Sequence, residues 1–114
     1  MKLYPLLFSF VQYAKVQHHL EPLLPLQEKV IRFQFQEECY SLHVARHEIK
    51  LSNMKDGTDT IVFSHEEDAR HLLTGAVRLQ PLLRRKGMEY KGTYRTMLLL
   101  ESLFHICKPL DARV

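Results

Sequence analysis

The segment "RRKGMEYKGTYRTMLLLESLF", which runs from Arg84 to Phe104, joins a short strand to a long apolar helix. Gly87 and Gly92 bound the strand, in which apolar and charged residues alternate as expected for a half-buried strand. Thr93 suits the cap of the helix, because its hydroxyl oxygen can accept a hydrogen bond from a free amide of the first turn. Since Gly92 lies between strand and cap, we expect it to adopt a positive φ that other residues avoid.

The helix after Thr93 carries a wide apolar stripe. Its members are Met97, Leu100, Leu103, Phe104 and Cys107, and Leu99 and Ile106 widen it further. Such a stripe normally fills a hydrophobic core. The surplus could instead line a cavity, and methionine suits that role because its flexible thioether adapts to varied ligands. The sequence leaves both interpretations open.

Four runs upstream have a period of two, which predicts strands. They are "VIRFQFQ" (30–36), "YSLHVAR" (40–46), "EIKLSN" (48–53) and "TDTIVFS" (58–64). The short connections between the first three predict antiparallel hairpins, and Gly57 is expected to take a positive φ in the turn before the fourth. A helix is predicted before the strands, from about Pro5 to about His19, because apolar residues recur there at helical spacing.

The fourth strand leads into another predicted helix. Ser64 and Glu67 have the spacing of a capping box, and Gly75 has the place of a C-terminal glycine. A short helix is expected near Pro81. Runs of strands followed by helices predict an α+β domain spanning 1–114, with a five-stranded, mainly antiparallel sheet and the helices packed on one face.

Composition narrows the class of protein. The chain has 114 residues, a formal net charge of +3 and two cysteines that are far apart. The mild basic excess does not favour a nucleic-acid partner, and Cys39 and Cys107 are expected to be free thiols of a cytoplasmic protein. The N-terminal segment lacks the cleavage site of a signal peptide, and no apolar run is long enough to cross a membrane.

The order and spacing of these elements resemble the sterol carrier protein type 2-like (SCP2-like) lipid-binding family. The likeness rests on "DTIVFSHEEDARHLLTGAVRL" (59–79), on "RRKGMEYKG" (84–92) with its following helix, and on "RFQFQEECYSLHV" (32–44). A charged turn stands in the last of these where the family commonly has glycine. The resemblance implies an apolar tunnel between a five-stranded sheet and the helices that cover it.

The resemblance also implies a function, namely non-catalytic binding or transfer of a lipid such as a fatty acid, an acyl-CoA or a sterol-like molecule. The cavity is expected to be lined by Phe33, Phe35, Leu72, Leu83, Met88, Tyr90, Met97, Leu100 and Phe104. The alternative is an interaction module of the same fold, with a filled core, that forms a homodimer or supports a partner. A cavity or a co-purifying lipid would favour the carrier.

A run of three basic residues is a candidate binding surface for anions. The consecutive Arg84, Arg85 and Lys86 could receive an anionic headgroup or an anionic membrane surface, although a solvated basic edge is the simpler interpretation. No catalytic residue, cofactor or metal site is predicted. His43 and His47 flank a hairpin turn without a cysteine or paired carboxylate at ligand spacing.

Overall fold

The computed structural model describes residues 3–16, 22, 24–46, 48–53 and 57–107. Its elements are α1 (Leu3–Lys15), β1 (Lys29–Phe35), β2 (Glu38–Ala45), β3 (Glu48–Ser52), β4 (Asp59–Phe63), α2 (Glu66–Leu73), α3 (Leu79–Arg84), β5 (Met88–Lys91) and α4 (Tyr94–Ile106). This order confirms the predicted succession of a helix, four strands, a helix, a short helix, a strand and a last helix.

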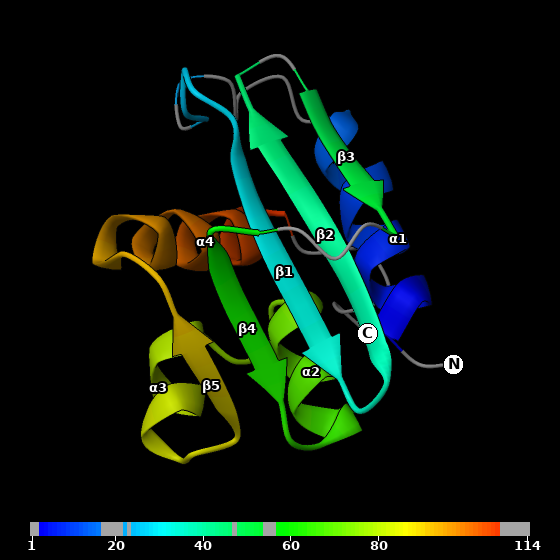
Figure 1. Cartoon of the computed structure of the whole chain (residues 1–114), viewed down its shortest axis with the longest axis vertical. Coiled ribbons are helices and arrows are strands. Elements are labelled where there is room, and N and C mark those ends of the chain that lie inside the picture. The colour runs from blue at the N-terminus through cyan, green and yellow to red at the C-terminus, as the bar shows by residue number, and fades with distance from the viewer. Residues whose placement is uncertain (1–2, 17–21, 23, 47, 54–56, 108–114) are drawn as a thin grey trace.

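The five strands form one sheet in the order β3-β2-β1-β4-β5 (Figure 1). The β1–β2, β2–β3 and β4–β5 pairs are antiparallel, as predicted for the hairpins. β1 and β4 are parallel, with Phe33 opposite Ile61. The sheet is therefore mixed, because the chain leaves the edge strand β3 and returns on the far side of β1.

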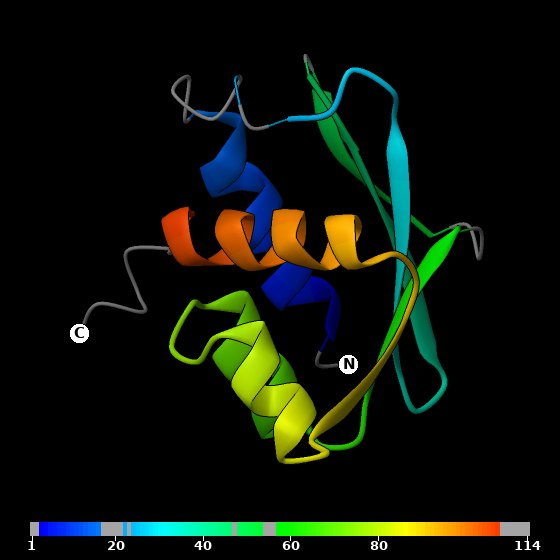
Figure 2. The ribbon, with the colours of Figure 1, turned by 90° about the vertical axis from the view of Figure 1, so that its left-hand side faces the viewer.

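All helices cover one face of the sheet, as predicted (Figure 2). The alternation of apolar and polar residues along β1 determines which face of the sheet the helices cover. Ile31, Phe33 and Phe35 are buried, whereas Arg32 and Gln34 are only half-buried. The apolar side chains of the strands therefore point toward the helices, and the polar ones occupy the open face.

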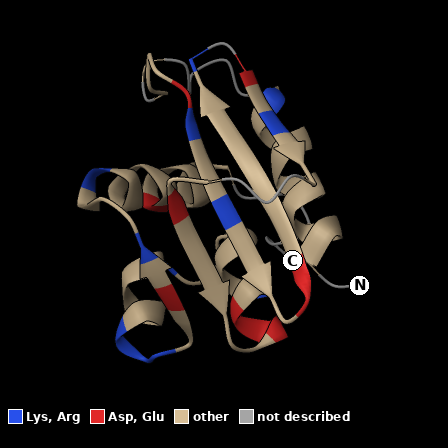
Figure 3. Cartoon of the chain, in the orientation of Figure 1, with Lys and Arg blue, Asp and Glu red and all other residues tan. Residues whose placement is uncertain are grey.

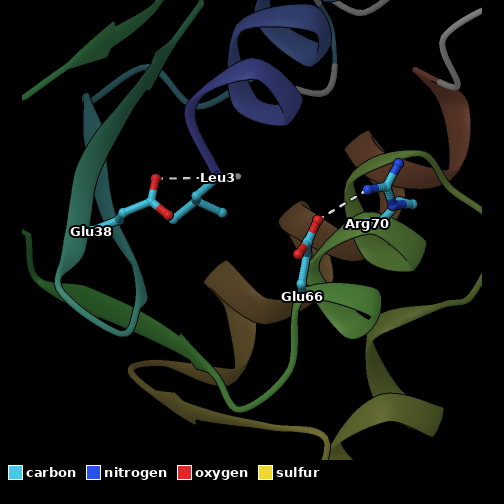
Figure 4. Close-up of polar contacts among 4 residues, drawn as sticks. All are labelled: Leu3, Glu38, Glu66 and Arg70. Carbon is cyan, nitrogen blue, oxygen red and sulfur yellow. Dashed lines mark hydrogen bonds and ion pairs between the residues drawn. The ribbon is translucent and has the colours of Figure 1, made fainter. Parts of the chain in front are cut away.

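Helix α1 is attached to the hairpin between β1 and β2 by a polar contact at its first residue. The amide of Leu3 donates a hydrogen bond to Oε1 of Glu38 over 3.3 Å (Figure 4). A carboxylate at this end of a helix also interacts favourably with the helix dipole. Figure 4 shows a second contact, within α2, between Arg70 and Glu66 at 3.1 Å.

The start of α2 differs from the sequence prediction. The helix begins at Glu66, and its N-cap residue His65 makes no side-chain capping bond, so the proposed capping box of Ser64 and Glu67 is wrong. Ser64 instead donates its amide to the carbonyl of Gly87 over 3.3 Å, which extends the pairing of β4 with β5. The helix ends as predicted, because Gly75 has a φ of 78°.

Gly57 is needed for a reason other than the predicted one. Its φ is not positive, but a β-carbon there would lie 3.0 Å from both the amide nitrogen and the β-carbon of Arg32. The amide of the next residue, Thr58, donates to the carbonyl of Val30 over 3.1 Å. Close approach of the chain to β1, rather than an unusual φ, therefore requires glycine here.

The junction between β5 and α4 is built on Asp59, the first residue of β4. Its side chain is buried, with an exposed fraction of 3%. Its Oδ1 accepts a hydrogen bond from the amide of Thr93 over 3.1 Å. Thr93 caps α4 as predicted, because its Oγ1 accepts from the amide of Thr96 over 3.2 Å. One carboxylate therefore joins the sheet to the start of the last helix.

Gly92 lies inside this junction. The predicted positive φ is wrong, but a β-carbon at Gly92 would overlap Oδ1 of Asp59 and lie 2.7 Å from the hydroxyl oxygen of Tyr90. That hydroxyl donates to the carbonyl of Thr93 over 2.6 Å, so it is not free to move away. Glycine is required because any side chain would displace the bond between Asp59 and Thr93.

We predict that Gly92→Ala lowers the free energy of unfolding by roughly 2 kcal/mol or more, because the new methyl group separates Asp59 from Thr93. Denaturant melts measure the change. The control is the same substitution in an Asp59→Ala background, where the overlap with Asp59 is gone, only the close approach to Tyr90 remains, and the added cost should fall. An equal cost in both backgrounds would contradict this explanation.

Candidate ligand-binding site

The residues predicted to bind a ligand gather in one apolar cluster between the sheet and the helices. Phe33, Phe35, Leu72, Met88, Met97, Leu100 and Phe104 are buried members, and Leu83 and Tyr90 pack against them half-buried. These residues come from β1, α2, α3, β5 and α4, and all nine belong to or pack against the one hydrophobic core of the described chain. That core also includes residues of α1, β2, β3 and β4, so its extent is wider than the predicted site.

Aromatic side chains occupy the centre of this cluster. The ring of Phe104 on α4 lies 4.9 Å from that of Phe10 on α1 and 6.1 Å from that of Phe33 on β1, both edge to face. The hollow beside Phe104, which Leu79 and Glu101 also line, has a volume of only about 10 Å³ and holds roughly one water molecule. A ligand at this place would therefore have to displace side chains.

The outer side of α4 is also partly apolar. Tyr94, Leu98 and Ile106 are exposed by 65%, 39% and 36% respectively. Leu99 is half-buried and packs against the core. The interpretation that Ile106 widens an inward-facing stripe is therefore wrong, because the surplus of apolar side chains on this helix lies at the surface.

Polar contacts tie α4 to α3. Both carboxylate oxygens of Glu101 accept from Gln80, one from its amide over 3.2 Å and one from its side chain over 3.3 Å. Further along the helix, His105 contacts Arg78, with 3.3 Å between Nε2 and Nη2. Together with Asp59, these residues hold the helix at its start, middle and end. The sequence analysis missed them because single polar residues at these positions have no pattern of their own.

The titratable groups of the cluster are uncharged near neutral pH. Burial raises the pKa of the Cys107 thiol to about 11. Burial also raises the pKa of Tyr90 to about 12, and the nearby carboxylate of Asp59 adds to the rise. Cys39 and Cys107 are free thiols, as predicted. The raised pKa of Cys107 means that this thiol is not activated as a nucleophile by its surroundings.

The basic cluster consists of Arg84, the last residue of α3, and of Arg85 and Lys86 in the turn that leads to β5, and all three residues are exposed. Nη2 of Arg85 is 3.8 Å from Oδ1 of Asp68 on α2. Figure 3 shows the cluster at the same end of the molecule as the acidic first turn of α2. The carboxylate of Asp68 therefore partly compensates the positive charge of Arg85.

Among the described residues, no group of three His, Cys, Asp or Glu side chains could hold a metal ion. Nδ1 of His43 lies 3.5 Å from Oε1 of Glu28, a contact without the geometry of a hydrogen bond, and His47 falls outside the described residues. No helix in the described part of the chain has the length and apolar character to span a membrane.

Comparison with solved structures identifies the fold. A structure titled "UbiJ-SCP2 Ubiquinone synthesis protein" superposes with a TM-score of 0.68 at 15% identity, over 94% of this chain and 95% of that one. Sterol carrier protein 2 from Yarrowia lipolytica, in its apo form, gives 0.59 at 11% identity over 89% and 88%. Palmitated SCP2L2 from Aedes aegypti gives 0.56 at 13% identity over 85% and 92%. No protein-family model and no curated protein sequence matches the chain.

These superpositions define the class of structure. The chain has the fold of sterol carrier protein 2 and of SCP2-like proteins, and it spans nearly the whole length of the three structures. The fold that the sequence motifs implied is therefore confirmed. The identities are low, so the likeness concerns the fold, and function is argued from the site.

Proposed function

We propose that this protein binds a lipid or another hydrophobic ligand without catalysing a reaction, and that the ligand lies in the apolar cluster beneath α4. The observation that carries the proposal is the fold shared with sterol carrier protein 2, in which the nine selected residues belong to or pack against the hydrophobic core. A structure with the same fold is titled as palmitated, which supports an acyl chain as the ligand. Fatty acids, acyl-CoA and sterol-like molecules are the classes that the cluster suits.

We propose that α4 moves when a ligand enters, because the rings of Phe10, Phe33 and Phe104 pack against one another beneath it. Asp59 and Thr93 fix the start of the helix, so we propose that α4 pivots there and swings away from the sheet. The acyl chain would then take the place of contacts made by Met97, Leu100 and Phe104. Met97 suits the rim of this space, because it is near the surface, with an exposed fraction of 9%, and its side chain is flexible.

We predict that the wild-type protein binds a fluorescent fatty-acid probe and that Leu100→Trp and Met97→Trp reduce this binding, because the larger ring fills the space an acyl chain would use. Overfilling also lowers stability, typically by ~1–3 kcal/mol. The matched control is Leu98→Trp on the outer side of the same helix, which should retain binding. No probe binding by the wild type would contradict the proposal.

Adding the fluorescent fatty-acid probe to the wild-type protein can also test whether α4 moves. Cys107 follows the helix and is fully buried, so its reaction with a thiol reagent should become faster when the probe is bound. Cys39, which is half-buried in β2, is the internal reference. Probe binding without faster labelling of Cys107 would place the ligand elsewhere and rule out the pivot.

The second candidate is an interaction module of the same fold. The close packing of the Phe10 and Phe104 rings and the position of β3 at the edge of the sheet favour it. Native mass spectrometry of freshly purified protein separates the two candidates. A co-purifying lipid supports the carrier, whereas a lipid-free dimer supports the module.

We further propose that Arg84, Arg85 and Lys86 dock the protein on anionic membranes, since each exposed basic side chain near such a surface adds ~1 kcal/mol. Reversal of all three charges to Glu should weaken binding to vesicles containing anionic lipid, and the difference should fade at high salt. Lys91→Glu with Arg95→Glu, at the other end of β5, is the control. Equal vesicle binding by wild type and triple variant would remove this role.

The absence of catalysis and a cytoplasmic location are also proposals. The raised pKa of Cys107, which keeps this thiol protonated, supports the first. The free thiols of Cys39 and Cys107 support the second, because a reducing compartment keeps cysteines unpaired. Fractionation of cells that express the protein would test the location.

A further inference from the structure

The strand β3 forms one edge of the sheet, and no strand of the described part of the chain pairs with its outer side. Ala45 pairs with Glu48 at the end of the β2–β3 hairpin, with two residues between them. In such a hairpin these two residues exchange both backbone hydrogen bonds, and the pattern alternates from there. The backbone groups of Glu48 and Lys50 therefore face β2, and those of Ile49 and Leu51 face outward. An edge of this kind is a template for another strand.

Charges on the same strand select the partner. Glu48 and Lys50 are exposed by 61% and 52%, and the distance between Nζ and Oε1 is 3.4 Å. We infer that β3 pairs with β3 of a second copy of this chain, antiparallel, with Ile49 opposite Ile49 on a two-fold axis. In this register Glu48 of each copy faces Lys50 of the other, as a non-hydrogen-bonded pair whose side chains approach closely.

Other registers are less favourable. A shift by one residue puts the apolar side chains of one copy on the open face of the other. The next register that keeps the faces aligned places Lys50 opposite Lys50, which brings like charges together. Charge complementarity thus favours one arrangement, and its contacts occur twice, as two-fold symmetry requires.

An exposed aromatic surface lies beside this edge. Tyr4 and Phe8 on α1 are exposed by 41% and 46%, and their rings stack at 5.9 Å. Tyr4, Leu51 and Ser52 line the same depression of the surface, so the aromatic pair adjoins β3. In the paired arrangement this surface would extend the contact on the helix-covered side of the sheet.

The opposite edge strand, β5, is a poorer candidate and supplies the control. It has four residues, and its Glu89 and Lys91 have the same spacing as Glu48 and Lys50. Arg84, Arg85 and Lys86 precede this strand and Arg95 follows it, so antiparallel self-pairing would bring basic residues of two copies together.

Sedimentation velocity over a concentration series tests the inference. The wild type should dimerise, and Glu48→Lys or Lys50→Glu alone should weaken dimerisation by about tenfold or more, since each creates two like-charge contacts. The mixture of the two variants should form a heterodimer as stable as the wild-type dimer. Glu89→Lys and Lys91→Glu should have no effect.

The mixture keeps the test valid if a single variant is less stable, because restored association requires folded chains. A monomeric wild type at every concentration would overturn the inference, and so would single variants that dimerise like the wild type. Failure of the mixture to associate would overturn the proposed register. The inference does not rest on lipid binding, and it stands or falls separately from the fatty-acid probe experiment.

Discussion

A single buried carboxylate, that of Asp59, determines where the last helix leaves the sheet. Burial of a charged group is costly unless hydrogen bonds compensate it, and Asp59 receives them from the amide of Thr93 and, over 3.3 Å, from the hydroxyl of Thr58. The start of a helix is also the favourable place for a negative charge. The same contact explains two neighbouring residues. Gly92 leaves room for the hydrogen bond between Asp59 and Thr93, and the hydroxyl of Tyr90 donates a hydrogen bond to the carbonyl of Thr93.

The position of α4 defines the candidate site. With its start held at β4, the helix places Met97, Leu100 and Phe104 over β1 and leaves Tyr94 and Leu98 outside. The contacts of Glu101 with Gln80 hold the helix at a second place, where both partners are only half-buried. Such contacts are easier to break than the buried junction at Asp59. This difference is the physical basis for proposing a fixed start and a movable remainder.

Much of the architecture could be predicted from residue periodicity. The alternation of Phe33 and Phe35 with polar neighbours identified both the strand and its buried face, and the apolar stripe of α4 identified its inner side. The parallel pairing of β1 with β4 was not predicted, because it depends on contacts between segments that are distant in sequence. Gly92 was selected correctly for the wrong reason, since a steric overlap with Asp59 is visible only in three dimensions.

The burial of the nine selected residues could be predicted from the sequence, and their role as ligand contacts stays a prediction. Residues that face one way on strands and helices must meet in the core, which is why these nine belong to it or pack against it. Whether they enclose a space depends on how their volumes fill it, and here Phe10 contributes a ring that the sequence analysis did not place in the site. Asp59 was missed because a lone acidic residue at the start of a strand has no distinctive spacing.

Native-state hydrogen exchange of the α4 amides in Asp59→Ala, compared with the wild type, tests this account most directly. If Asp59 holds the helix on the sheet, the amides from Met97 to Leu100 should lose protection, while those of β1 and β2 keep most of theirs. Unchanged protection in α4, or an equal loss across the helix and the central strands, would contradict the account.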